Sequence, residues 1–164
     1  MKRFHLAMLL TLCLCVPLAA QEKEMEPDTV VIRSDQVEID LNSGVAIYTG
    51  NVVVEDKPAM EINCEVLTLQ IEEGTQEVNK ITASGKVKIF LTHEQGSGIA
   101  TGEQAVFFVD QDRIELTGKA SMETLQGKMW GDLIYFDRAT YKLRAKGNIR
   151  MEIDPKMLQK EGDK

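Results

Sequence analysis

The amino-acid sequence predicts an antiparallel all-β protein of the sandwich, jelly-roll or solenoid kind. A strand-like segment with a Gly-Asn or Gly-Lys pair at its middle recurs four times, with glycines at positions 50, 85, 118 and 147. Each copy follows another strand-like segment that begins near an acidic residue, and a short polar turn separates the two. Beyond the first 20 residues, no amphipathic stretch of helical period exceeds two turns. Short, regular connections between alternating strands are typical of antiparallel β proteins.

Residues 1–20 have the features of a secretory signal peptide. Two basic residues precede an apolar run over residues 4–16, and Leu18-Ala19-Ala20 places small residues before an abruptly charged segment. This pattern predicts export and cleavage, with a mature chain that begins near Gln21. An uncleaved membrane anchor is the alternative, although the apolar run is short for a membrane span.

The predicted mature chain is acidic, and its charge is uneven. Residues 21–79, which begin with an acidic segment over residues 21–29, have a net charge of −11, whereas residues 80–164 have a net charge of +2. A nucleic-acid-binding role is excluded, because neutralising phosphates needs concentrated Lys and Arg. Cys64 is the sole cysteine beyond the signal segment, so no intramolecular disulfide is predicted.

The repeated Gly-Asn and Gly-Lys pairs could be hairpin turns or the middles of long strands. A hairpin would mix apolar and polar residues on both faces of the third copy, whereas one continuous strand separates them cleanly. In that strand one face is Ile114, Leu116, Gly118, Ala120 and Met122. The second and fourth copies agree, and the first is ambiguous. We therefore predict long strands with the glycine on the inward side, where it marks a bulge, a bend or a close approach.

The strands between the glycine segments are expected at residues 34–40, 63–69, 102–108 and 131–137. Polar turns are expected at residues 42–44, 72–74, 110–112 and 137–140, with a looser loop over residues 93–98. The tail over residues 154–164 is charged and interrupted by Pro155, and it is expected to be disordered.

The inward faces mix branched apolar residues with many glycines and alanines. Small residues could let two sheets approach each other or bend, which gives a closely packed interior. They could also line an apolar trough that holds a hydrocarbon ligand. The residues alone leave both interpretations open.

Four strings in the chain, GVAIYTGNVVVED, VNKITASGKVKIF, RIELTGKASME and YKLRAKGNIRMEI, resemble the OstA-like repeats of periplasmic lipopolysaccharide-transport proteins of the LptA type. The similarity covers residues 30–153. The chain departs from the family at Cys64-Glu65, where Ala-Asp is usual, and in its acidic N-terminal half.

The resemblance implies an open, twisted, antiparallel β-jelly-roll, sandwich-like and built from repeated strand pairs. It implies a periplasmic carrier whose apolar interior shields the acyl chains of lipopolysaccharide or a related glycolipid, with no enzyme activity and no cofactor. Inward residues near the middle of each strand are the expected lipid contacts: Val52, Val54, Ile62, Val87, Ile89, Phe107, Leu116, Met122, Tyr135, Ile149 and Met151. The phases of Phe107 and Tyr135 are ambiguous, because apolar residues flank both.

The resemblance also implies jelly-roll partners at the inner and outer membranes and end-to-end stacking. Charge supports head-to-tail self-association, because the first strand exposes Asp35, Glu38 and Asp40 and the last exposes cations such as Arg144. An equally favoured interpretation is that the charged side chains of both terminal strands are merely solvated and contribute little to association. Two alternatives to a carrier remain: a membrane-anchored LptC-type partner and a ligand-free structural β-repeat protein.

The single residues give no sign of catalysis. His93, with one neighbouring carboxylate, lacks the ligand count of a metal site, and no nucleophile is placed beside it. Cys64 alternates with apolar residues and is expected to be a buried small hydrophobe. No metal site is predicted.

Overall fold

The computed structural model describes residues 29–56, 58–93 and 96–155 as one antiparallel β-sheet. The predicted signal segment at residues 1–20 and most of the predicted tail therefore lie outside the described residues. The strands of the sheet are β1 (Val31–Arg33), β2 (Gln36–Asp40), β3 (Val45–Asp56), β4 (Met60–Ile71), β5 (Val78–His93), β6 (Gly96–Phe108), β7 (Arg113–Thr124), β8 (Gly127–Asp137), β9 (Lys142–Lys146) and β10 (Arg150–Ile153).

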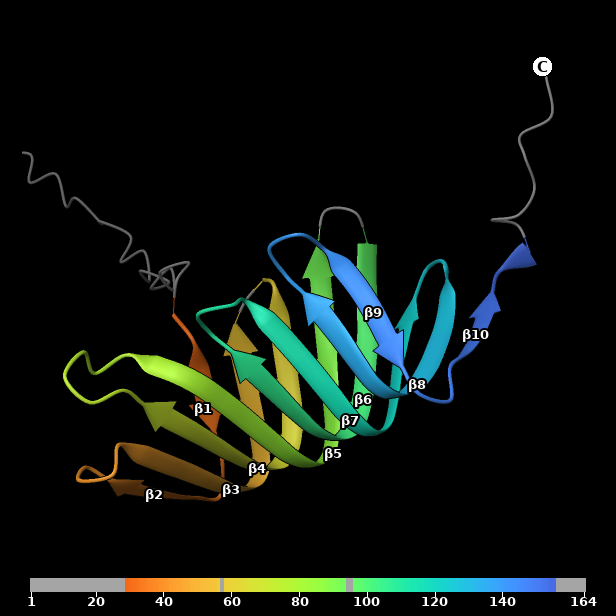
Figure 1. The fold of residues 1–164 in the computed structure, drawn as a ribbon. Coiled ribbons are helices and arrows are strands. Elements are labelled where there is room, and N and C mark those ends of the chain that lie inside the picture. Colours follow the sequence, from red (N-terminus) through yellow and green to blue (C-terminus); the bar gives the residue numbers. More distant parts are fainter. Residues whose placement is uncertain (1–28, 57, 94–95, 156–164) are drawn as a thin grey trace, which may run out of the picture.

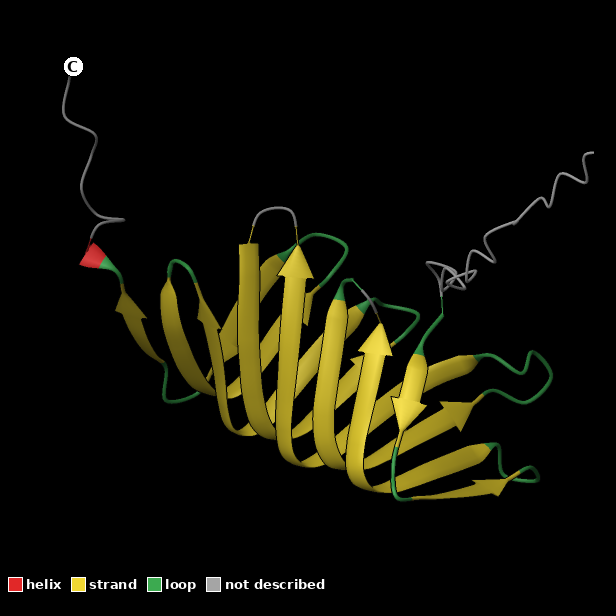
Figure 2. Ribbon diagram, turned by 180° about the vertical axis from the view of Figure 1, so that it is seen from behind, coloured by secondary structure: helices red, strands yellow, loops and turns green. Residues whose placement is uncertain are grey.

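The sheet bends back on itself along a line that crosses the long strands near their middles (Figures 1 and 2). Each of β3 to β8 therefore belongs to two layers that meet at the bend and diverge at their free ends. We call one the β1 layer, with β1, β10 and residues 52–56, 60–64, 87–93, 96–102, 120–124 and 127–131. The other is the β2 layer, with β2, β9 and residues 45–49, 66–71, 78–84, 104–108, 113–117 and 133–137.

The long-strand interpretation of the glycine motifs is correct for the first three copies, because Gly50, Gly85 and Gly118 each lie inside one continuous strand. In the fourth copy β9 ends before the pair, and β10 begins after it. Both halves still pair with β8, so this copy is the same element with its strand interrupted at the bend. Strands β1 and β2 form a matching interrupted strand at the other edge of the sheet.

Each bend places a glycine and its successor opposite one acidic residue of the preceding strand. In β3, for example, the pairing with β4 shifts register between Thr49 and Val52. Both residues of every pair have positive φ, from 83° at Gly50 to 43° at Asn148. The residue that follows the glycine then contacts the acidic side chain. The contacts are Asn51 to Asp35, Lys86 to Glu65, Lys119 to Glu103 and Asn148 to Asp132.

This geometry corrects the expectation that the glycines face inward. A Cβ added at Gly85 would lie 2.5 Å from Glu65 Oε2 and 2.8 Å from the Glu65 Cβ. The space beside each of the four bend glycines is taken by the carboxylate side chain of the neighbouring strand. An L-residue there would combine an unfavourable backbone conformation with a steric clash.

The apolar core lies between the two layers. Alternation along the strands sends one set of side chains inward, and the largest of them are almost completely buried. These fully buried side chains are Leu67, Ile89, Ile114, Leu116, Ile134, Val52 and Val87. Both layers contribute to the set, so the bent sheet packs against itself as a sandwich does.

Candidate functional site: an apolar trough between the layers

Cross-strand register lines up the inward side chains in apolar rows that run from one edge of the sheet to the other. In the β1 layer one row consists of Ile32, Val54, Ile62, Ile89, Ala100, Met122, Met129 and Met151. In the β2 layer one row consists of Ile39, Ala46, Leu69, Ile81, Phe107, Ile114, Phe136 and Leu143. The interior is therefore lined by apolar side chains across every strand.

The middle of this interior is closed by direct packing between the layers. Ile62 and Ile89 of the β1 layer share a cavity of only about 10 Å³ with Ile81, Phe107 and Ile114 of the β2 layer. A space of that size is at the limit for one water molecule. Of the two interpretations that the sequence left open, packed or hollow, the packed one holds here.

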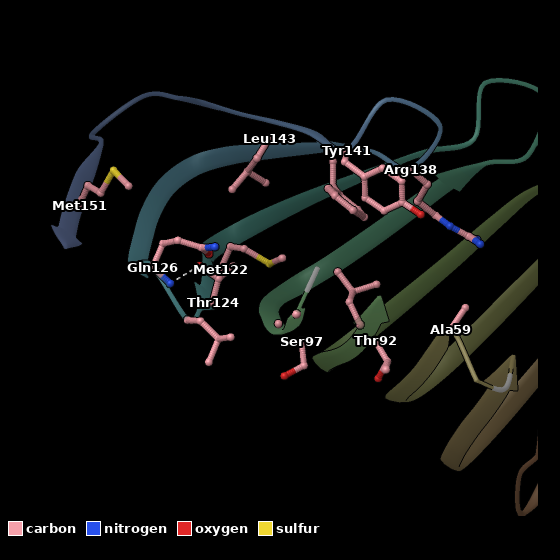
Figure 3. Close-up of a pocket in the computed structure, with 15 residues that line it drawn as sticks. Ala59, Thr92, Ser97, Met122, Thr124, Gln126, Arg138, Tyr141, Leu143 and Met151 are labelled. Atoms are coloured by element: carbon pink, nitrogen blue, oxygen red, sulfur yellow. Dashed lines mark hydrogen bonds between the residues drawn. The ribbon is translucent and has the colours of Figure 1, made fainter. Parts of the chain in front are cut away.

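Toward the C-terminal edge the layers separate, and a groove of about 410 Å³ opens between them (Figure 3). Its walls carry apolar side chains from both layers, among them Leu91 and Met122 of the β1 layer and Phe136 and Leu143 of the β2 layer. Met151 of the edge strand β10 lies at its far side. The hollow interpretation therefore holds for this end of the trough.

Arg138 lies where the packed part meets the groove and links the free ends of the two layers. It belongs to the β8–β9 turn of the β2 layer and lines the groove. Its Nη2 lies 3.8 Å from Oδ2 of Asp56, in the β1 layer, and its Nε lies 3.5 Å from Oδ1 of Asp112, in the β2 layer. Its guanidinium carbon is 5.4 Å from the centre of the Phe107 ring, which places the charge over an apolar face.

Most of the residues expected to contact lipid do point inward. Seven of them belong to the buried core: Val52, Val54, Ile62, Val87, Ile89, Leu116 and Met122. Phe107 is partly buried and packs against that core, so its inward phase is confirmed. Of these residues, Met122 alone lines the C-terminal groove.

The expected inward position of Tyr135 is wrong. Ile134 is fully buried and Phe136 lines the groove, which leaves Tyr135 on the outer face, with Lys146 Nζ 5.2 Å from the centre of its ring. Four successive apolar or aromatic residues at positions 133–136 hide the alternation, so the side on which Tyr135 lies is decided by the pairing of β8 with β7 and β9.

Ile149 and Met151 lie at the edge of the sheet and are more than half exposed, at 58% and 55%. They are therefore not core residues, although Met151 borders the groove. Sequence reasoning did not select Phe136 and Leu143, which form much of the groove wall. The cross-strand pairing of Phe136 with Leu143 identifies them, but that pairing is a property of the folded sheet.

Cys64 is buried, as expected, and desolvation raises the pKa of its thiol. Within the described parts of the chain, His, Cys, Asp and Glu residues form no group of three or more that could hold a metal ion. Among the same residues, no helix has the length and apolar character needed to cross a bilayer.

Comparisons with known proteins agree with this architecture. Residues 31–142 match the family model described as LptA/(LptD N-terminal domain) LPS transport protein. The chain is 27% identical over 139 residues to the lipopolysaccharide export system protein LptA of Escherichia coli K12, covering 81% of this chain and 75% of that protein. The LptA of Shigella flexneri matches to the same extent.

The chain is also similar in structure to LptH from Pseudomonas aeruginosa, the LptA-homologous periplasmic component of a lipopolysaccharide transport device. The TM-score is 0.71 at 22% identity, over 78% of this chain and 96% of LptH, which supports the open jelly-roll fold. Because the family model matches well over half of the sequence, the chain belongs to the LptA/LptD N-terminal domain family of lipopolysaccharide transport proteins.

Proposed function

We propose that this protein is a periplasmic carrier that shields the acyl chains of lipopolysaccharide in its apolar trough. The observation that carries the proposal is the set of unbroken apolar rows that open into the groove at the C-terminal edge. Burying hydrocarbon stabilises a complex by about 0.8 kcal/mol for each methylene group. A lipid with several chains therefore gains more from a continuous apolar surface than from a single anchoring residue. The carrier needs no reacting group, which agrees with a transport rather than an enzymatic role.

The groove is the part of the trough that can accept a chain without repacking. Leu91, Met122 and Leu143 already border open space, whereas Ile89 and Ile114 line the cavity of about 10 Å³ in the packed part. We therefore place the first acyl contacts in the groove, with the packed part opening only as more chain enters.

Site-specific photocrosslinking tests this placement. A photoreactive residue at Leu91 or Met122 should form lipopolysaccharide adducts in cells, because both positions line the groove. The adjacent positions Phe90 and Glu123 are matched controls, since Phe90 lies under Lys88 and Glu123 pairs with Lys128 outside the trough. Adducts at neither member of a pair, or equal adducts at both, would contradict the carrier proposal.

The proposed partners follow from the two open edges of the sheet. Val37 and Ile39 of β2 are each 54% exposed at one edge, and Ile153 of β10 is 44% exposed at the other. All neighbouring pairs are antiparallel and the strands from β2 to β9 are even in number. A translated second copy would therefore place its β2 antiparallel to β9 and extend the sheet. Jelly-roll partners at either membrane could add to the same edges.

Mixing two edge variants tests head-to-tail association. Val37→Asp should block one edge and Ile153→Asp the other, so each variant alone should remain monomeric by light scattering, because every head-to-tail contact needs one intact edge of each kind. Their mixture should form dimers that join the two intact edges. Unchanged long assemblies in either variant would exclude this mode of association.

Localisation and anchoring depend on the N-terminal segment. A periplasmic carrier released by cleavage should have a mature N-terminus near Gln21. Mass spectrometry of the protein from its host reads this directly, and a retained segment would support the membrane-anchored alternative. The ligand-free scaffold is tested by the crosslinking above.

A further inference from the structure

A second, polar cleft lies on the outer face of the β2 layer, on the same strands that form the groove wall. It has a volume of about 480 Å³ and is lined by Arg113, Glu115, Tyr135, Asp137, Lys142, Arg144 and Lys146. Alternation explains the back-to-back arrangement, because Phe136 and Leu143 face the groove while their neighbours Tyr135 and Arg144 face the cleft.

The cleft carries an excess of positive charge. Four of its lining residues are cationic and two are acidic, and both carboxylates are already engaged. Glu115 accepts a 2.9 Å contact from Arg113, and Asp137 accepts a 2.8 Å hydrogen bond from the backbone N–H of Thr140. After the hydrogen bonds from Thr140, the charges of Arg144 and Lys142 also hold the pKa of Asp137 below its usual value, so three β9 cations share one nearby carboxylate and the excess of positive charge remains. This concentration is notable in a chain with a net charge of −7.

Two further features suit a saccharide that bears anionic groups. The Tyr135 ring belongs to the central strand of the cleft, and Lys146 Nζ lies 5.2 Å from the ring centre, so an aromatic surface and a cation meet at one point of the lining. Arg113 Nε is buried and has no hydrogen-bond partner among the described residues. A donor in that condition is costly to leave unpaired, and a phosphate oxygen could satisfy it once the Arg113 side chain turns toward the cleft that it lines.

We propose that this cleft binds the phosphate-bearing saccharide of the glycolipid whose acyl chains enter the groove. The inference rests on the proposed carrier function. One ligand could contact both sites across the free edge of the β2 layer, where Arg138 and Tyr141 line the groove and Lys142 lines the cleft. Apolar chains on one side of the layer and an anionic saccharide on the other match the amphipathic character of such a lipid.

The acidic β2 edge of a second copy is the competing occupant. A strand added at β9 would lie beside Lys142, Arg144 and Lys146, and so could use part of the charge. Tyr135 and Arg113 belong to the next two strands inward, each about 4.8 Å further from the edge. A neighbouring edge strand does not cover them, which favours a ligand that lies over three strands.

The test uses the full protein and two soluble probes: the deacylated, phosphorylated oligosaccharide of lipopolysaccharide and the same oligosaccharide after dephosphorylation. Arg113→Gln and Arg144→Gln are each expected to weaken binding of the phosphorylated probe about two- to fivefold, as the loss of one partly exposed charge pair predicts. Neither should change binding of the dephosphorylated probe. Thermal unfolding of each variant checks that the fold is retained, and Arg144, which is exposed, covers the case in which Arg113→Gln destabilises it.

Lys88→Gln is the matched control, because Lys88 lies 4.6 Å from the Phe90 ring centre on the outer face of the other layer, as Arg113 lies 4.9 Å from that of Phe108. An equal loss of phosphorylated-probe binding in Lys88→Gln, or equal binding of the two probes by the parent protein, would overturn the proposed saccharide site. The proposal would also be overturned if Arg144→Gln weakened binding of the phosphorylated probe in the parent protein but not in a Glu38→Gln/Asp40→Asn background. The cations would then serve self-association. Inorganic phosphate that competes as well as the oligosaccharide would reduce the site to a simple anion site and would also overturn the proposal. Because these probes have no acyl chains, failure here leaves the groove crosslinking result, and the carrier function, independently testable.

Discussion

The side-chain amide of Asn51 donates a 2.9 Å hydrogen bond to the carboxylate of Asp35 at the first bend of the sheet. At the second bend, Lys86 Nζ lies 2.8 Å from the carboxylate of Glu65. The shorter acid thus faces the shorter amide, and the longer acid faces the longer ammonium group. The Cys64-Glu65 departure from the usual Ala-Asp is matched in this way by Lys86 across the bend.

The bend glycines should be far less tolerant than glycines in turns. Gly85→Ala places a methyl group 2.8 Å from the Glu65 Cβ, at a backbone φ of 79°. Overpacking should add about 1–3 kcal/mol to the cost of the left-handed conformation. Gly74→Ala is the control, because Gly74 also has a positive φ but has no atom within 4 Å of the added Cβ. Urea unfolding should show the larger loss for Gly85→Ala, and equal losses would contradict the steric role of Glu65.

Arg138 should hold the free ends of the layers together through Asp56 and not through Asp112. Asp56→Asn removes the charge pair between layers, whereas Asp112→Asn removes one within the β2 layer. Ion pairs this exposed contribute about 0.2–1 kcal/mol, so Asp56→Asn should raise transient opening of the trough about two- to fivefold.

A thiol introduced by Met60→Cys in a Cys64→Ser background reports this opening, because Met60 is 7% exposed and pairs with Asp56 at the free ends of the layers, whereas Cys64 lies beside the bend. Modification of the introduced thiol by a small thiol reagent, followed by mass spectrometry of the peptide that contains it, should accelerate in Asp56→Asn and stay at the parent rate in Asp112→Asn. Matching accelerations in the two variants would mean that the effect is general destabilisation and not a link between layers.

The packed and open parts of the trough should separate stability from lipid binding. Ile114 is 2% exposed, and Ile114→Ala should lower the free energy of unfolding by about 2–5 kcal/mol. Leu143 is half-buried and borders the groove, so Leu143→Ala should cost less stability but weaken lipid binding more. Chemical unfolding and a lipopolysaccharide binding assay on both variants measure the two effects. If Ile114→Ala remains fully folded and yet loses more lipid binding than Leu143→Ala, then the lipid binds in the packed part of the trough.

The β2–β3 turn should loosen in acid. Hydrogen bonds from the Ser43 side chain, then from the backbone N–H groups of Asn42 and Ser43, hold the pKa of Asp40 below its usual value. A carboxylate with a lowered folded-state pKa stabilises the folded form above its unfolded pKa of about 3.9 and loses that contribution as the pH falls through the folded value.

Hydrogen exchange of the amides in β2 should therefore accelerate, relative to the sheet centre, as the pH falls below about 4. Asp40→Asn should remove most of this pH dependence and should resemble the acidic parent protein at pH 7. Persistence of the full pH dependence in the variant would assign it to another group.

The sequence was sufficient for the long strands, because the alternation of Ile114 and Leu116 continues past Gly118 to Ala120 and Met122. It was insufficient where alternation is absent, as around Tyr135, whose phase depends on pairing between strands. The acid that faces each bend glycine was also not predictable, since Asp35 and Asn51 are 16 residues apart and meet only in the folded sheet. The groove depends on how far the two layers diverge at one edge, which no local pattern records.

Each long hairpin contains one bend glycine and one acidic residue that faces a bend glycine of a neighbouring strand. The bend is therefore built by the repeated hairpins themselves. Duplication of one unit, such as the 33 residues from Lys86 to Gly118, would add two strands and lengthen the trough by about 9.6 Å without altering either edge. Deletion of a unit would shorten it by the same step and preserve the direction of the terminal strands. The length of the trough therefore changes in steps of two strands. During evolution it can change independently of what the two edges of the sheet bind.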